Sequence, residues 1–142
     1  LNEHVGGISY LSKIDNKFFV SQGMDKKIII WNMGERKLFQ TIPNGSDYIT
    51  AIVVHPNQYL ITQDIEKKIL LWDIKQNKLI KRIDTKPVYM RAFALMPNGF
   101  IVSGSNDFMV EIWNPINGEC IKKLSGHTNY VNAVSVINDR LI

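Results

Sequence analysis

Residues 28–32 of this chain read Ile-Ile-Ile-Trp-Asn, residues 69–73 read Ile-Leu-Leu-Trp-Asp, and residues 110–114 read Val-Glu-Ile-Trp-Asn. A fixed internal period is the signature of a repeat protein, so it decides the fold before any other feature does. A unit of this length built from short strands cannot bury its own faces, and neighbouring units must cover them. The tryptophans of the three stretches are Trp31, Trp72 and Trp113, which stand 41 residues apart both times.

The period extends beyond the tryptophans. A shift by one repeat, without a gap, superimposes small hydroxyl residues, turn acids and strand-opening apolar residues in all three copies. A register held this long excludes chance similarity and divides the chain into repeats at approximately residues 4–44, 45–85 and 86–126, with an incomplete repeat at 127–142. The superimposed sets are Ser21, Thr62 and Ser103; Asp25, Glu66 and Asp107; Ile8, Ile49, Met90 and Val131; and Ala51, Ala92 and Ala133.

The composition is that of an ordinary globular protein. Of the 142 residues, 45% are hydrophobic and 21% are charged, which excludes a disordered chain and favours a single domain. No apolar run approaches the roughly 20 residues that cross a bilayer, and no secretory leader opens the chain. The single cysteine, Cys120, cannot form an internal disulfide, so we expect a small apolar strand residue in a protein of the cytoplasm or nucleus.

The charge pattern does not indicate a nucleic-acid protein by itself. The net charge is +4, yet the 17 basic and 13 acidic residues are interspersed along the chain. No block of like charges and no basic helix is present. Binding of nucleic acid, or of acidic lipid or phosphate, through basic side chains is therefore kept only as an alternative function.

Each repeat contains four short strand patterns separated by turn residues. The third pattern, for example Ile28-Ile29-Ile30, is apolar on both faces, so both faces of each small sheet must be covered. No stretch has a helical period. The sequence predicts an all-β fold of stacked four-stranded antiparallel sheets, with strands at 8–13, 18–22, 27–32 and 37–41; at 49–54, 59–63, 68–73 and 78–82; and at 90–95, 100–103, 109–114 and 120–123.

With this period in place, the residues resemble the WD40-repeat β-propeller family. Trp31-Asn32, Trp72-Asp73 and Trp113-Asn114 stand where the family has its tryptophan-aspartate pair. Gly126-His127 matches the glycine-histidine pair, and residues 103–107 resemble the strand-and-turn segment. The resemblance covers essentially the whole chain. It implies about three and a half blades of a propeller of roughly seven, within the usual range of about four to eight.

The resemblance also implies a structural hydrogen-bond relay within each blade, formed by a histidine, a strand hydroxyl, a turn acid and the indole. The second repeat has Gly45, and the third has Lys86, at the histidine position. We expect water or a backbone carbonyl to replace the histidine there, with lower local stability, because an unpaired buried polar group costs roughly 1–3 kcal/mol. The relay residues are His4, Ser21, Asp25 and Trp31; Thr62, Glu66 and Trp72; Ser103, Asp107 and Trp113; and His127.

Three and a half blades cannot close a ring, and open blades expose sheet faces and edges. Our leading expectation is that the chain is an excerpt of a longer protein whose remaining blades complete the propeller. The rival is self-association of short chains into a ring. Two copies would then leave two unfinished half-blades.

No catalytic, cofactor or metal constellation is found. The chain lacks a phosphate loop, a Cys-x-x-Cys pair, a His-Glu-x-x-His motif and a nucleophile elbow. His4 and His127 share one phase of the repeat, which indicates a structural role. His55 precedes Pro56 and is predicted to be a surface turn residue. We expect no enzyme.

A partner surface is predicted on one rim of the propeller, as the family resemblance implies. Tyrosine and arginine are enriched in binding hot spots, and lysines at the same rim would favour an acidic or phosphorylated peptide. The alternative is that each tyrosine ring only packs over the neighbouring blade. The expected function is thus a protein–protein interaction scaffold. The predicted rim residues are Tyr48, Tyr89 and Tyr130; Thr50, Arg91 and Asn132; and Lys26 and Lys67.

Overall fold

The computed structural model describes residues 3–42, 49–85 and 88–137, and of Thr50 only the backbone. This part of the chain contains twelve β-strands and no helix. The first repeat contributes β1 (Ile8–Lys13), β2 (Phe18–Gly23), β3 (Ile28–Asn32) and β4 (Lys37–Ile42). The second contributes β5 (Ile49–His55), β6 (Tyr59–Asp64), β7 (Lys68–Asp73) and β8 (Lys78–Asp84). The third contributes β9 (Met90–Leu95), β10 (Ile101–Ser105), β11 (Val110–Asn114) and β12 (Glu119–Leu124).

Each set of four strands forms one antiparallel sheet in chain order, which we call blades one, two and three. The prediction of an all-β fold of four-stranded antiparallel sheets is confirmed, and strand ends differ from the predicted ones by two residues or fewer. Short hairpins join the strands. In the first, the Asp15 carboxylate accepts hydrogen bonds from the backbone N–H groups of Lys17 and Phe18 over 2.7 and 2.8 Å, which closes the turn.

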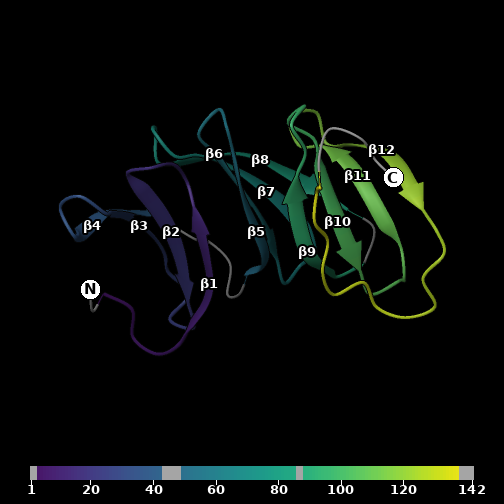
Figure 1. Ribbon diagram of the computed structural model, residues 1–142, viewed down its shortest axis with the longest axis horizontal. Coiled ribbons are helices and arrows are strands. Elements are labelled where there is room, and N and C mark those ends of the chain that lie inside the picture. The colour runs from purple at the N-terminus through teal and green to yellow at the C-terminus, as the bar shows by residue number, and fades with distance from the viewer. Residues whose placement is uncertain (1–2, 43–48, 86–87, 138–142) are drawn as a thin grey trace.

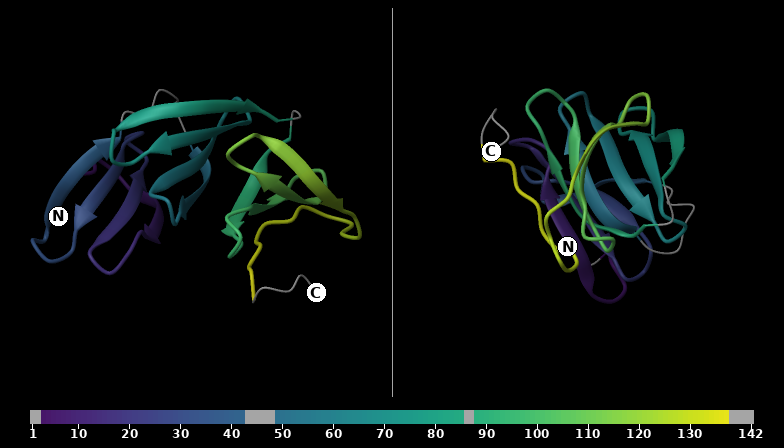
Figure 2. Two further views of the ribbon diagram at one scale, coloured as in Figure 1. Left: turned by 90° about the horizontal axis from the view of Figure 1, so that it is seen from above. Right: turned by 90° about the vertical axis from the view of Figure 1, so that its right-hand side faces the viewer.

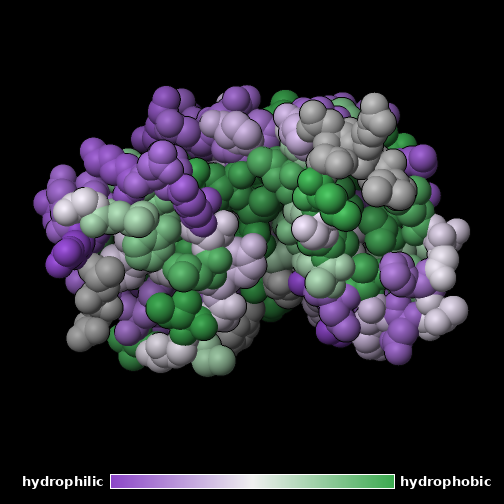
Figure 3. Space-filling model, viewed as in Figure 1, coloured by the Kyte–Doolittle hydropathy of each residue, from purple (hydrophilic) through white to green (hydrophobic). Residues whose placement is uncertain are grey.

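The blades lie side by side along an arc, with β1, β5 and β9 on the inner side (Figures 1 and 2). Strand β5 lies beside both β1 and β9. These inner strands line a hollow whose middle is hydrophobic on the face shown in Figure 3. The arrangement is consistent with consecutive blades of a partial propeller.

The core lies between the blades because both faces of the central strands are apolar. One cluster joins Ile28 and Ile30 of blade one to Ile52 and Leu60 of blade two, all at most 1% exposed. A second cluster joins blade two to blade three in the same way, through Ile61, Ile69, Phe93 and Ile101. Burial of this kind contributes roughly 25 cal/mol per Å² of apolar surface, so packing between blades is the main stabilising term. Cys120 packs against the second cluster, as predicted for a small apolar strand residue.

A buried glutamine at one repeat position also ties each blade to the next. Gln22 donates to the backbone carbonyl of Ile49 over 3.3 Å, and Gln63 accepts from the backbone N–H of Met90 over 2.7 Å. The third repeat has Gly104 at this position, where an added Cβ would lie 2.6 Å from the side chain of Val131. The absence of a side chain thus admits Val131, which is 5% exposed.

The start of the fourth repeat differs from the prediction. The repeat aligns Val131 with Ile8, Ile49 and Met90, which predicts a first strand from this residue, but none forms among the described residues 125–137. Val131 donates its backbone N–H to the carbonyl of Ser105 over 3.0 Å, which joins this segment to blade three. Within the described part of the chain, no helix is long and apolar enough to cross a membrane.

Candidate functional site: a cation and tyrosine rim

The end of the blades that holds the β2–β3, β6–β7 and β10–β11 turns forms the rim. The first residues of β5 and β9 lie at the same end, since Ile49 pairs with Asp64 and Met90 pairs with Ser105. Five predicted residues gather here, from the β6–β7 turn of blade two, the start of blade three and the segment after β12. We call them the rim cluster: Lys67, Tyr89, Arg91, Tyr130 and Asn132.

Two cation and aromatic pairs organise the rim cluster. The Lys67 ammonium lies 4.5 Å from the ring centroid of Tyr89. The Arg91 guanidinium lies 4.6 Å from the ring centroid of Tyr130. Contacts of this kind contribute about 0.5–1 kcal/mol at exposed sites and hold the cation in place over the ring face. The tyrosines therefore do more than pack on the next blade, because each also positions a basic side chain.

The backbone of the turns directs these side chains outward. Lys67 has a φ of 68°, and Lys26 and Phe108, at the same position of the other repeats, have φ values of 66° and 68°. Left-handed backbone costs a non-glycine residue roughly 1–2 kcal/mol. Arg36, Gln58 and Asn77, in turns at the opposite end of the blades, also have positive φ values, so this conformation is a feature of the turns and does not by itself mark the rim.

The acidic groups of these turns are engaged elsewhere. The Glu66 carboxylate pairs with the Lys68 ammonium over 3.2 Å. Asp107 accepts a hydrogen bond from the Ser105 hydroxyl. Arg91 makes no ion pair with any described residue. The guanidinium is therefore available to an external anion.

An open pocket of about 500 Å³ lies beside these groups and is lined by Tyr89, Met90, Arg91 and Asn132. Tyr89 and Tyr130 are 40% and 50% exposed. The Tyr89 backbone is held by Asn106, whose side-chain oxygen accepts from the Tyr89 N–H over 3.1 Å and whose own N–H donates to the Tyr89 carbonyl over 3.0 Å. The pocket thus has fixed backbone beneath exposed side chains.

Three predicted rim residues are not part of this cluster. Lys26 is exposed in the β2–β3 turn of blade one. Tyr48 and the side chain of Thr50 lie outside the described residues. Phe108 was missed by sequence reasoning: its ring centroid is 5.8 Å from that of Tyr130, and it is 39% exposed. Its phase, shared with Lys26 and Lys67, was the signal that could have found it.

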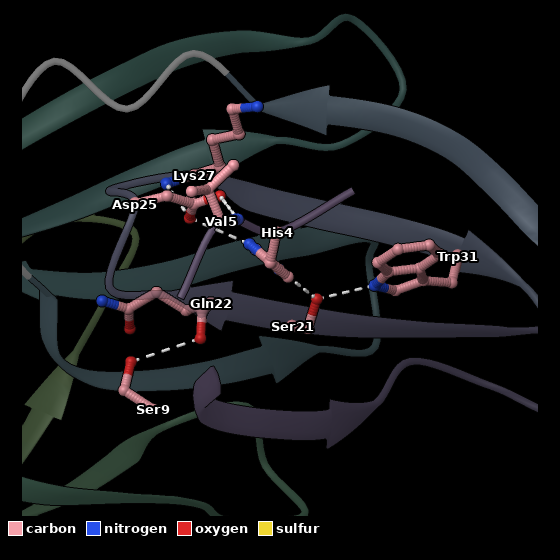
Figure 4. A network of polar contacts seen from close by, with 8 residues as sticks. All are labelled: His4, Val5, Ser9, Ser21, Gln22, Asp25, Lys27 and Trp31. Atoms are coloured by element: carbon pink, nitrogen blue, oxygen red, sulfur yellow. Dashed lines mark hydrogen bonds and ion pairs between the residues drawn. The ribbon is translucent and has the colours of Figure 1, made fainter. Parts of the chain in front are cut away.

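The relay expected in the first repeat is present in blade one (Figure 4). The Trp31 indole N–H donates to the Ser21 hydroxyl over 2.6 Å, and Ser21 Oγ lies 2.7 Å from His4 Nε2. His4 Nδ1 lies 2.9 Å from the Asp25 carboxylate. An unbroken chain of donors places the histidine proton on Nδ1.

The Asp25 carboxylate ends this relay. Burial opposes its ionisation, but hydrogen bonds from the Val5 N–H, from His4 and from the Lys27 N–H outweigh burial and lower the pKa of Asp25 from 3.8 to about 2. The ion is therefore stabilised within the blade, and nothing about it points to acid–base chemistry.

Blades two and three keep only the hydroxyl and indole pair. Trp72 donates to Thr62, and Trp113 to Ser103, both over 3.1 Å. The Ser103 hydroxyl also donates to the backbone carbonyl of Glu111 over 3.5 Å, which is the kind of substitute expected for the histidine.

The turn acid of blade two does not occupy the relay. The side chain of Glu66 is 63% exposed, and the buried acid is Asp64, at the repeat position of Gly23. A Cβ on Gly23 would lie 2.3 Å from His4 Nδ1, so histidine and a side chain at this position exclude one another. The second repeat has Gly45 in place of histidine in its sequence, and Asp64 is buried in blade two. Its Oδ1 accepts from the Lys68 N–H over 3.0 Å.

The remaining histidines take different positions. His127 is exposed in the segment after β12. The prediction of a surface turn residue is wrong for His55, which is only 7% exposed. Its ring contacts Gly99 of blade three, and its Nδ1 accepts from the Asn57 N–H over 3.2 Å. Sequence reasoning weighed the Pro56 turn but not the glycine that makes room for the ring in the next blade.

No group of three or more His, Cys, Asp or Glu side chains that could hold a metal ion occurs within residues 3–42, 49–85 and 88–137. The rim cluster offers two cations, an amide and two phenol rings, which are groups that bind a ligand by charge, hydrogen bonding and aromatic contact.

Comparison with protein families supports the resemblance. Residues 118–141 match the family model for the WD domain, G-beta repeat. The matched stretch contains β12 and the Gly126-His127 pair, and it is consistent with a WD40-repeat family. No curated protein matches the chain. Repeats of this kind in blade-like sheets indicate a protein-interaction scaffold.

Proposed function

We propose that this chain is a non-catalytic interaction scaffold whose rim cluster binds an acidic or phosphorylated segment of a partner protein. The observation that supports this most is the Arg91 guanidinium, stacked on Tyr130 and facing an open pocket without a carboxylate partner among the described residues. A guanidinium can offer two parallel N–H donors to a carboxylate or phosphate.

The neighbouring groups fit the same ligand. The Lys67 ammonium adds a second positive charge beside the pocket. Tyr89 and Tyr130 supply rigid, half-exposed rings at low entropic cost, and Asn132 offers an amide to a peptide backbone. Together they provide one anchor point for an anion, surrounded by aromatic rings, which suits a single acidic or phosphorylated residue in an extended peptide.

Peptide binding is separated from nucleic-acid binding by its response to salt. Several phosphate contacts would weaken binding on the order of tenfold or more between roughly 50 and 200 mM salt. Docking through one anion and two tyrosine rings releases fewer counterions, so we expect a much smaller loss.

The experiment is a calorimetric titration of three peptides that differ only at one central residue: phosphothreonine, glutamate or threonine. The wild-type chain is expected to bind the first two and not the third. Replacement of Tyr89→Ala together with Arg91→Ala is expected to abolish binding while thermal unfolding stays cooperative.

A matched control removes two exposed lysines from the other end of the blades, Lys37→Ala and Lys78→Ala, which open β4 and β8. The control lowers the net charge by more than the test variant does. Unchanged affinity in the Tyr89 and Arg91 variant, or equal loss in the control, would contradict the proposal.

A further inference from the structure

The outermost strands of the three blades are edges, since β4, β8 and β12 each pair with only one neighbour in the sheet order. An edge strand leaves unpaired backbone N–H and C=O groups, and proteins protect such edges with charged side chains. The repeat allows the three edges to be compared position by position.

Two of the three edges carry this protection. Blade two has Lys81 and Arg82, and blade three has Lys122 and Lys123, at two successive positions near the end of the strand. In blade one the same two positions hold Gln40 and Thr41. The end of β4 therefore lacks the charges found at the ends of β8 and β12, and the charge of this strand is confined to Lys37 at its start.

A pocket lies against this unprotected edge. It has a volume of about 260 Å³ and is walled by Phe18, Ile30, Phe39 and Ile74 at the seam between blades one and two. Phe39 is 54% exposed, and its ring centroid is 4.7 Å from that of Phe18. The β4 bulge places Phe39 and Gln40 together at the pocket, because Leu38 and Gln40 pair with successive residues of β3 and leave Phe39 as the extra residue.

The equivalent seam between blades two and three is occupied by side chains. His55, at the repeat position of Ile14, contacts Gly99, which replaces Gln58. Lys81, at the position of Gln40, donates its ammonium to the backbone carbonyls of Ile116 and Asn117 over 3.1 and 3.0 Å. Gln40 likewise reaches across the first seam, where its side-chain amide donates to the Ile74 carbonyl over 2.8 Å. The two seams therefore differ at the His55 ring, which contacts Gly99, and the first seam keeps the open pocket.

We propose that β4 is a second docking site, at which an extended segment of a partner protein adds a strand and inserts one aromatic or aliphatic side chain into the seam pocket. Strand addition satisfies the free backbone groups, and the pocket selects the anchor side chain. One of these groups is already engaged, since the Asn77 side chain donates to the Thr41 carbonyl over 3.3 Å, so an added strand would pair with the groups that precede it along β4.

The charged side chains at the mouth of the pocket indicate which residue type is favoured beside the anchor side chain of this segment. Lys75 lines the pocket, is exposed and makes no ion pair with a described residue. The Asp15 carboxylate at the same mouth is bound by the N–H groups of its own turn. An acidic residue next to the anchor would therefore be favoured, while a basic one would not. This site is separate from the rim cluster and does not depend on it.

The test uses the full chain and a fluorescein-labelled probe peptide, acetyl-Ser-Thr-Phe-Glu-Val-Thr-Ser-amide, with a second peptide in which serine replaces the phenylalanine. Fluorescence polarisation is expected to show binding of the first peptide and binding about tenfold or more weaker for the second. The variant Gln40→Lys with Thr41→Arg, which copies the protected edge of blade two, is expected to lose binding to the same degree.

A control adds the same charge elsewhere, Ser125→Lys with Thr128→Arg, at exposed positions after β12, and is expected to bind as the wild type does. Hydrogen exchange of the wild-type chain supplies a readout that needs no variant: the probe is expected to protect amides of β4. Absence of binding, protection away from β4, or equal binding by the protected-edge variant would overturn the proposal. So would a dimer of the wild-type chain that this variant dissolves, because the occupant would then be a second copy.

Discussion

The side-chain Oε1 of Gln63 accepts a hydrogen bond from the backbone N–H of Met90 over 2.7 Å, and both residues are fully buried. Gln63 lies in β6 of blade two and Met90 opens β9 of blade three. The bond fixes the strand that carries Tyr89 and Arg91, so the stability of the blade seam and the geometry of the rim cluster depend on the same contact.

Replacement of Gln63→Leu is expected to destabilise the protein by roughly 1–3 kcal/mol, because the Met90 N–H would stay buried without an acceptor. Urea unfolding followed by tryptophan fluorescence measures the change. The exposed Gln76→Leu serves as the control. An unchanged midpoint for the Gln63 variant would show that the interblade bond does not contribute.

The Asp25 carboxylate makes the free energy of unfolding depend on pH in the acid range. Its pKa in the folded protein is about 2, below the ordinary value of 3.8. Its contribution is therefore fully present above about pH 3.8 and is lost as the pH falls from there toward 2. Asp25→Asn is expected to be less stable at neutral pH and to lose less stability over that interval. Equal pH profiles for the variant and the wild type, from urea unfolding at each pH, would contradict this.

The His55 ring makes the free energy of unfolding depend on pH nearer neutrality. Burial lowers its pKa below the ordinary 6.5, and this outweighs the opposing hydrogen bond with the Gly99 backbone. The unfolded chain binds this proton at a higher pH than the folded chain does. The contribution of His55 to the free energy of unfolding is therefore fully present above pH 6.5 and is lost as the pH falls below it. NMR titration of the ring is expected to give a midpoint below that of a histidine peptide, and His55→Gln is expected to flatten the stability profile near pH 6. A midpoint at or above the peptide value would refute the prediction.

A substitution of Lys67 tests whether the β6–β7 turn contributes to binding. Lys67→Gly removes the ammonium over Tyr89 and relieves the positive φ, so we expect folding stability to change by no more than about 1 kcal/mol while the affinity for the phosphothreonine peptide falls several-fold. Arg36→Gly is a matched control, since Arg36 also has a positive φ, of 53°, and lies in the β3–β4 turn at the opposite end of the blade. Comparable loss of affinity in both variants would point to net charge rather than to the rim.

The strands could be predicted almost residue by residue because the repeat supplied three copies of one pattern. Ile28, Ile69 and Val110 each follow a turn, and errors in one copy were corrected by the others. The first strand of the fourth repeat could not be judged in this way. Its pattern is present, but pairing depends on a neighbouring strand and not on local propensity.

The side-chain contacts between blades could not be predicted from the sequence. The phase of Tyr89, Arg91 and Tyr130 placed them on one rim, yet only the structure shows that Arg91 lies over Tyr130 and not over Tyr89. His55 was misread for the same reason, because its burial depends on Gly99, 44 positions later in the chain.

The most direct measurement is amide hydrogen exchange of the whole chain with and without the phosphothreonine peptide at saturating concentration. The account predicts slower exchange at the start of β9, in the β10–β11 turn and at residues 129–132, with no change in the β3–β4 and β7–β8 turns at the opposite end. Protection confined to that opposite end, or no protection at any amide despite measured binding, would contradict the assignment of the rim cluster as the partner site.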